Sequence, residues 1–228
     1  MTTVSRASAT PAPPDLMAGK SYGPRHLEIL EGLETIVLTE GFRDLTVGGL
    51  AERLRCSRRT LYEIADSKEG LVLIAIDRVL RRLARIAREA SAREATLLDQ
   101  VRAYLTKGLT ELHRATLSFT EDVAASPDAA LLVSSHFRYA RSIVERMLVK
   151  GTETGEFRSI HPRLTAETFD AGLMRLLDPD VLRSAGVTFA EAVEEYLTLF
   201  TDGIRAPMPG QSTARLGLGA RRAMRGTA

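Results

Sequence analysis

The sequence predicts an all-α protein, with three short helices at the N-terminal end followed by a larger set of long helices. Between residues 24 and 203 apolar residues recur at steps of three and four, and no alternating strand pattern persists. Helix-start signals precede several of these segments: Ser91 with Glu94, Thr188 with Glu191, and Ser126 before Pro127. We expect helices near 24–40, 47–54, 58–65, 68–90, 94–114, 127–150, 164–177 and 188–203, with a short one near 117–124.

The two ends of the chain differ from its body. Residues 1–22 and 205–228 are rich in Gly, Pro and Ser, lack periodicity and are basic, so each is expected to be a disordered segment. The tail from Arg205 holds five arginines and no acid, although the net charge of the whole chain is only +2. The body between them divides into a small domain over 23–66 and a helical domain over 67–204.

Composition places the chain among ordinary soluble proteins. Its 44% hydrophobic and 26% charged residues are typical values, and they name no partner. The longest apolar run, 71–76, is far shorter than the roughly 20 residues of a membrane span, and the N-terminus lacks the apolar stretch of a secretory signal. The single cysteine, Cys56, excludes an intramolecular disulfide. A cytoplasmic protein with no membrane partner is expected.

The first three helices have helix-turn-helix spacing. Gly41 is a natural C-cap for the first helix, and Thr46 can cap the second. The second helix carries one apolar stripe over two turns, and Ser57 can cap the next helix three residues later. A short helix, a tight turn and a second two-turn helix form the geometry of a helix-turn-helix head.

The third helix presents polar side chains on the face opposite its core residues. Leu61, Ile64 and Ala65 face inward, while Arg59 and Glu63 point outward. Arginines at 53, 55, 58 and 59 place four like charges within seven residues. Such a face is either a solvated charged surface or a surface that binds an anion, and DNA phosphates are anions of the required kind.

The segment "ILEGLETIVLTEGFRDLTVGGLAERLRCSRRTLYEIADSKEGL" resembles the DNA-binding domain of the tetracycline-repressor-like (TetR) family. The features that match are a first helix ending in E-G-F, Thr-Val opening the second, an alanine ahead of T-L-Y, and then S-K-E. The resemblance implies base contacts in the major groove from Arg58, Arg59 and Thr60, since arginine can donate two hydrogen bonds to guanine. It also implies phosphate contacts from Thr46, Ser57, Tyr62 and Lys68.

The sequence departs from the family pattern at four places. Arg55 stands at a turn position that often takes a positive φ, and Arg59 replaces a common glycine. Ile64 and Ala65 replace an aromatic pair. Glu63 lies where phosphates would approach, so it either pairs with Arg59 one turn away or accepts from cytosine N4. The operator sequence therefore cannot be transferred from relatives.

The long helices are expected to supply a dimer interface and an effector pocket. Paired half-sites require a dimer. The family places dimerisation in the last two helices. Their apolar stripe could instead complete the core of one subunit. The candidate interface residues are Ala171, Gly172, Phe189, Val193, Tyr196, Leu197 and Phe200. Rings and donors suited to a small-molecule site occur on the middle helices, at Tyr104, His113, Phe119, His136, Phe137, Tyr139 and Arg175.

The remaining chemistry-bearing residues support no catalytic or metal site. The four histidines lack metal-ligand spacing, and neither a nucleophile–base arrangement nor a phosphate-binding glycine motif stands out. Cys56 is either a packed core residue or a redox-sensitive thiol among arginines. The arginines of the fourth helix are expected on a solvated face, with Asp77–Arg81 and Arg85–Glu89 paired at i, i+4. No enzyme activity and no cofactor are expected.

The sequence therefore predicts a ligand-responsive transcriptional regulator. In this reading a homodimer binds a palindromic operator on double-stranded DNA, acts as a repressor and is released by a small-molecule effector. The alternative is a helical protein-binding or assembly module, such as a co-regulator that keeps the helix-turn-helix head.

Overall fold

The computed structural model describes residues 10–109 and 114–206. Within these ranges the chain forms ten helices and no strand, which confirms the predicted all-α class. The helices are α1 (Pro24–Glu40), α2 (Val47–Arg53), α3 (Arg58–Ile64), α4 (Lys68–Ser91), α5 (Leu97–Leu109), α6 (Leu117–Ala125), α7 (Pro127–Thr154), α8 (Pro162–Leu176), α9 (Pro179–Ala185) and α10 (Phe189–Ile204).

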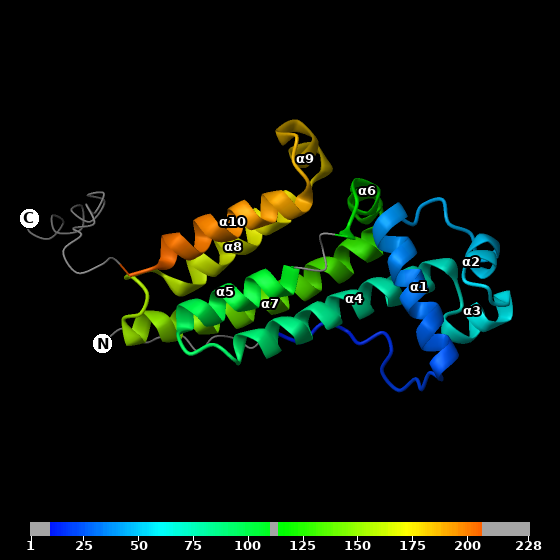
Figure 1. Cartoon of the computed structure of the whole chain (residues 1–228), viewed down its shortest axis with the longest axis horizontal. Coiled ribbons are helices and arrows are strands. Elements are labelled where there is room, and N and C mark those ends of the chain that lie inside the picture. Colours follow the sequence, from blue (N-terminus) through cyan, green and yellow to red (C-terminus); the bar gives the residue numbers. More distant parts are fainter. Residues whose placement is uncertain (1–9, 110–113, 207–228) are drawn as a thin grey trace, which may run out of the picture.

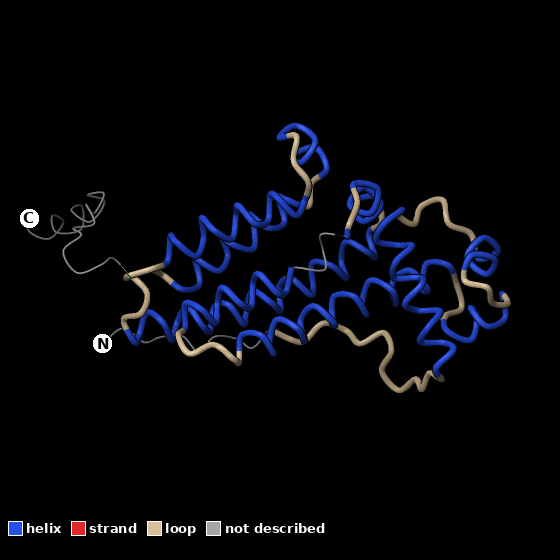
Figure 2. Tube along the Cα trace, in the orientation of Figure 1, coloured by secondary structure: helices blue, strands red, loops and turns tan. Residues whose placement is uncertain are grey.

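The molecule is elongated, with a small head at one end of a helical body (Figure 1). The head consists of α1, α2 and α3, and α4 runs from it along the body. In the body α4 packs against α5 and α7, α8 packs against α7 and α10, and α10 closes on α5. Figure 2 shows that tight loops join α2 to α3 and α3 to α4, as the helix-turn-helix spacing predicts.

Side-chain caps begin the short helices where the sequence predicts them. Thr46 Oγ1 accepts a hydrogen bond from Gly49 N at 3.1 Å, and Ser57 Oγ accepts one from Thr60 N at 3.0 Å. Ser67 caps α4 in the same way. Gly41 ends α1 with φ 83°, a conformation that side chains disfavour. Each cap replaces a backbone partner that the helix end lacks.

The predicted helix pattern differs from the structure at several points. Ser91 does not cap a new helix, because α4 continues through it, and Thr96 caps α5 instead by accepting from Asp99 N at 3.1 Å. The sequence pattern also missed α9, which Asp178 caps and Gly186 ends in the left-handed conformation. The predicted capping box of Thr188 and Glu191 is confirmed at the start of α10.

Buried polar contacts join the head to the body. Glu34 of α1 is buried, and its two carboxylate oxygens accept from Arg78 Nε and Arg82 Nη1 of α4, each at 2.5 Å. On the other side, Asp122 of α6 accepts from the backbone N–H groups that follow α1. A shift of α4 or α6 would therefore act on α1 directly, since a buried carboxylate is costly to leave unpaired.

Residues 10–22 lie against the body, in contrast with the disordered arm that their composition predicts. Leu16, Met17 and Tyr22 pack on the hydrophobic core, and the N–H of Leu16 donates to Asp77 Oδ2 at 3.2 Å. Farther along, Lys20 Nζ donates to the carbonyl of Ile64, at the end of α3, at 2.9 Å. The segment is non-periodic because it forms no helix or strand and is held by individual contacts, which leave no repeating pattern in the sequence.

None of the helices within the described ranges is long and apolar enough to cross a membrane. Of the predicted disordered tail over 205–228, residues 207–228 lie outside the described residues.

Candidate nucleic-acid interface and ligand cavity

The predicted base-contacting residues occupy the first turn of α3. Arg58 and Arg59 are exposed, and the side chain of Arg59 is 91% accessible. Arg58 makes no ion pair within the described part of the chain; its guanidinium lies against Gly48 of α2, where an added Cβ would come within 2.7 Å of it. Thr60 Oγ1 lies 2.9 Å from Ser57 Oγ, so the cap also orients this hydroxyl.

Most of the predicted phosphate-contacting residues stand at helix starts. Thr46 and Ser57 are the N-caps of α2 and α3, and Lys68 is the first residue of α4. Lys68 Nζ donates to the carbonyl of Arg43 at 3.1 Å, which holds the ammonium beside the loop before α2. Tyr62 lies farther along α3 and is half-exposed. Free N–H groups and the helix dipole favour anions at the three helix starts.

Glu63 pairs within the head, as one of the two sequence interpretations proposes. Its carboxylate lies 3.4 Å from Arg59 Nε and 3.3 Å from His26 Nε2 of α1. This pairing uses only one edge of the Arg59 guanidinium, so the remaining N–H groups stay free for an acceptor in a groove.

The turn between α2 and α3 accommodates an arginine where glycine is common. Arg55 has φ 49°, the positive value expected at this position. Arg25 of α1 stabilises the turn, because its Nη2 donates to the carbonyls of Leu54 and Arg55 at 3.3 and 2.7 Å. Cys56 packs against the core beside it, and burial raises the pKa of its thiol despite the nearby charge of Arg25. A raised pKa disfavours the reactive thiolate and supports the packing interpretation.

Several predicted interface residues are buried within the subunit. Phe189, Val193 and Leu197 belong to its core. Tyr196 packs on Gly172, where an added Cβ would clash with the phenol, and its hydroxyl donates to the carbonyl of Phe169 at 2.9 Å. Two predicted interface residues remain. Ala171 is exposed, and Phe200 is half-buried, with its ring centroid 4.5 Å from that of Phe169.

The outer surface of α8 and α10 carries apolar residues that the sequence analysis did not single out. Leu164 is 61% exposed and Leu199 is 67% exposed, one on each helix. Both were missed because an apolar stripe read from the sequence identifies the buried side of a helix first, and these residues fall outside that stripe.

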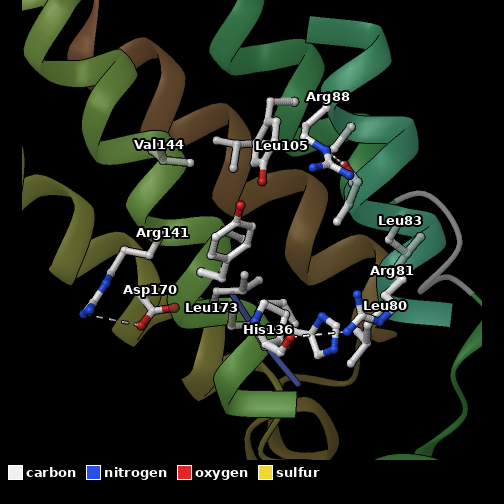
Figure 3. Close-up of a pocket in the computed structure, with 18 of the residues that line it drawn as sticks. Leu80, Arg81, Leu83, Arg88, Leu105, His136, Arg141, Val144, Asp170 and Leu173 are labelled. Atoms are coloured by element: carbon white, nitrogen blue, oxygen red, sulfur yellow. Dashed lines mark hydrogen bonds and ion pairs between the residues drawn. The ribbon is translucent and has the colours of Figure 1, made fainter. Parts of the chain in front are cut away.

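A cavity of about 210 Å³ lies between α4, α5, α7 and α8, and part of residues 10–22 borders it. Figure 3 shows its wall, with Leu80, Leu83, Leu105, Val144 and Leu173 supplying apolar surface. Four of the predicted pocket residues line it, and they are Tyr104, His136, Phe137 and Tyr139.

The other predicted pocket residues lie elsewhere. Phe119 is buried and packs edge-on against Phe42, with 6.3 Å between ring centroids, outside this cavity. Arg175 is exposed and pairs with Asp178. His113 lies outside the described residues.

Sequence reasoning missed four charged residues of the cavity wall, Arg81, Arg88, Arg141 and Asp170. The expected pairs Asp77–Arg81 and Arg85–Glu89 both form, at 2.8 and 3.1 Å. Side chains on a broad basic helix face look solvated in sequence, and only the packing of α4 against α7, and of α7 against α8, shows which charged side chains line a cavity.

Asp77 is the centre of a buried polar network beside the cavity. Its Oδ1 accepts from His136 Nε2 at 2.7 Å, and its Oδ2 accepts from Arg81 Nε at 2.8 Å and from Leu16 N at 3.2 Å. Burial by itself would raise the pKa of Asp77, but these hydrogen bonds and the charge of Arg81 outweigh burial and lower it. The network therefore joins α4, α7 and the N-terminal segment through one ionised carboxylate.

Two further wall residues have shifted pKa values. Burial raises the pKa of Tyr104 to about 12, so its hydroxyl stays protonated at neutral pH. Burial also raises the pKa of Asp170, although Arg141 opposes this from 3.8 Å.

Comparison with known proteins gives one curated relative and several solved structures. No family model matches the chain. An uncharacterised HTH-type transcriptional regulator of Bacillus subtilis, YvaF, is 24% identical over 182 residues, which cover 78% of this chain and 94% of the relative. The sequence similarity therefore extends over head and body together.

Three solved structures illustrate the similarity of fold. Escherichia coli NemR in its reduced form aligns with TM-score 0.63 and 18% identity over 80% of this chain and 98% of its own. A transcriptional regulator of the TetR/AcrR family from Thermobifida fusca aligns with TM-score 0.59 and 17% identity, over 80% of this chain and 100% of its own. A protein from Saccharomonospora viridis, solved in complex with choline, aligns with TM-score 0.64 and 16% identity, over 80% of this chain and 98% of its own. The head, the long α4 and the packed helical body of this chain are thus the fold of the TetR-family transcriptional regulators.

Proposed function

We propose that the protein is a ligand-responsive transcriptional regulator that binds double-stranded DNA as a homodimer. The observation that carries the proposal is the first turn of α3, where two arginines are exposed and the Arg58 guanidinium lies against Gly48 near the capped start of α2. The fold is that of DNA-binding regulators, which supports the same reading. The test is selection of bound fragments from random-sequence DNA by purified protein, which returns a palindromic operator if the proposal holds and unselected sequence if it fails.

The arrangement supplies both kinds of contact that sequence-specific binding needs. Arg58, Arg59 and Thr60 form the edge that would enter the major groove, where arginine reads guanine O6 and N7. Thr46, Ser57, Tyr62 and Lys68 flank that edge and would hold phosphates, which fix the orientation of the head on the duplex. Glu63 holds Arg59 from one side and so limits the directions in which its guanidinium can point.

Replacement of Lys68 with methionine is expected to weaken binding to all DNA sequences alike. The substitution removes one phosphate contact per subunit, so the slope of log K against log salt should fall in magnitude by about 2 for a dimer. Titration of operator and random duplexes at several salt concentrations measures this slope. Lys150→Met, an exposed lysine at the far end of α7, is the matched control. A loss confined to the operator would contradict the phosphate assignment.

Dimerisation through α8 and α10 would place two heads on one operator. Helix-turn-helix dimers read half-sites about 34–36 Å apart, so a second copy is needed. The exposed Leu164, Ala171 and Leu199 are available for such an interface, while the buried residues of the same helices hold the pair together within each subunit.

Replacement of Leu199 with arginine is expected to weaken self-association roughly tenfold or more. A symmetrical interface receives the new charge twice, and each charge must be desolvated on association. Sedimentation velocity over a range of protein concentrations measures the change. Leu131→Arg alters an apolar residue of α7 that is 63% exposed, and it should leave the equilibrium unchanged. Equal behaviour of the two variants would place the interface elsewhere.

The switch would work through the elements that join the cavity to the head. A ligand in the cavity contacts α4, and α4 holds α1 through the pairs of Arg78 and Arg82 with Glu34. Residues 10–22 provide a second connection, because they border the cavity and also reach the end of α3 through Lys20. A ligand that binds better to an arrangement with displaced heads shifts the population away from DNA, in proportion to its differential affinity. We therefore propose that the protein represses transcription while bound to its operator and that the ligand releases it from the DNA.

A further inference from the structure

The cavity wall contains two phenol hydroxyls that no group of the described chain satisfies. Tyr104 is 3% exposed, and its hydroxyl makes no hydrogen bond with any described residue. Tyr139 also lines the cavity, and its hydroxyl makes none within the same ranges. The two phenols are close enough for Tyr139 to raise the pKa of Tyr104. No buried side-chain nitrogen or oxygen of the described chain lacks a hydrogen-bond partner, so the two hydroxyls open into the cavity, where they can donate to a ligand that supplies an acceptor.

The charges around the cavity favour an anion beside these hydroxyls. Arg88 lines the cavity near Tyr104 and has no carboxylate partner within the described part of the chain; its Nε donates only to the carbonyl of Ala84. The other two wall arginines are already paired, Arg81 with Asp77 and Arg141 with Glu167 and Asp170. Figure 3 shows Arg88 on the opposite side of the cavity from the Arg141–Asp170 pair.

The size and lining of the cavity limit the rest of the ligand. An engineered cavity of about 150 Å³ holds benzene, so about 210 Å³ accepts a single ring with a short substituent. Most of the wall is aliphatic or aromatic, which favours an apolar body. Asp170 is the carboxylate of the wall, and because Arg141 already neutralises it, a cationic ligand would find no free counter-charge.

We propose that the effector is a small apolar monocarboxylic acid whose carboxylate accepts from the Tyr104 and Tyr139 hydroxyls and pairs with Arg88. Its ring or short chain fills the space between Leu105, Val144 and Leu173. The inference rests on the proposed function in that the ligand is taken to be the effector, but the binding event itself does not depend on DNA.

Calorimetry with the full-length protein tests this proposal directly, since the chain has no tryptophan to serve as a fluorescent reporter. Benzoate and phenylacetate are titrated beside benzamide, benzylamine and choline. Benzoate or phenylacetate should bind at least roughly tenfold more tightly than the neutral and cationic probes, because only an acid supplies a charged acceptor. Equal binding of benzamide, preferred binding of an amine, or no binding of either acid would overturn the proposal.

Two variants assign the contacts. Tyr104→Phe keeps the ring and removes the donor, and Arg88→Gln removes an exposed charge whose loss does not disturb the core. Each should weaken acid binding roughly tenfold or more, whereas Arg85→Gln on the same helix, outside the cavity, should leave it unchanged. If both cavity variants bind the acid like the unmodified protein, the assignment is wrong.

Operator binding in the absence of ligand is measured separately on the same preparations. Acid binding without DNA binding would refute the proposed function and leave the ligand site standing. DNA binding without acid binding would refute the ligand class alone.

Discussion

Replacement of Asp77 with alanine is expected to lower the free energy of unfolding by about 3–5 kcal/mol, the usual result of removing one partner of a buried charged network. The Asp77 side chain is fully buried. Its loss leaves His136 Nε2, Arg81 Nε and the N–H of Leu16 without their common acceptor. The contacts that hold residues 10–22 would weaken at the same time. Chemical denaturation monitored by circular dichroism measures the change.

The pH dependence of stability distinguishes this network from simple packing. Because the pKa of Asp77 is lowered below its ordinary value of 3.8, its contribution is complete above that value and is lost as pH falls through the lowered pKa. Its side-chain partners are His136 and Arg81, and Arg81 also lies 3.6 Å from Asp15. Asp77→Asn should therefore be much less stable than the unmodified protein at neutral pH, with a smaller difference in acid. Asp180→Asn, which alters an exposed carboxylate, is the control. If Asp180→Asn lowers the free energy of unfolding as much as Asp77→Asn does, the network is contradicted.

Replacement of Arg59 with alanine is expected to cost about 1–3 kcal/mol of operator affinity in each half-site, and therefore roughly 2–6 kcal/mol per dimer. The side chain is the most exposed of the head's ion-paired arginines, so its removal leaves the fold intact. Preference at one base pair of each half-site should also disappear, because the bidentate contact with guanine is lost. Competition binding against a panel of single-base operator variants measures both effects.

Arg93→Ala provides the matched control for Arg59. This arginine is exposed in the loop after α4 and carries the same charge far from the head along the sequence. If Arg59→Ala loses affinity for random and operator DNA equally, Arg59 holds a phosphate and the base-reading role belongs elsewhere on α3. If both variants lose affinity equally, the effect is one of net charge.

The head could be predicted almost completely from the sequence. Thr46, Ser57 and Gly41 are local signals, because a cap or a positive φ depends on a few neighbouring residues. The positive φ at Arg55 was expected on different grounds, from the resemblance to the TetR-family turn. The body was predicted less well, since Ser91 has the spacing of a cap but is the last residue of α4, and Thr96 caps the next helix instead.

The cavity shows the limit of sequence reasoning more clearly. Tyr104, His136, Phe137 and Tyr139 were found because rings and donors in an apolar setting suit a small molecule. Phe119 and Arg175 have the same chemistry but lie elsewhere, since residue type does not give direction in space. Whether the predicted base and phosphate contacts form stays a prediction for the DNA-binding experiments.

The sequence by itself determined the helical class, the helix-turn-helix head and the charge carried by α3, because these follow from periodicity, capping and residue type over short distances. Only the tertiary structure decided that Arg88 and Tyr104 border one cavity, that Asp77 ties the N-terminal segment to α7, and that Phe189 and Val193 are buried within the subunit. These features depend on contacts between residues far apart in the chain, and a helical pattern shows which face is apolar without showing what covers it.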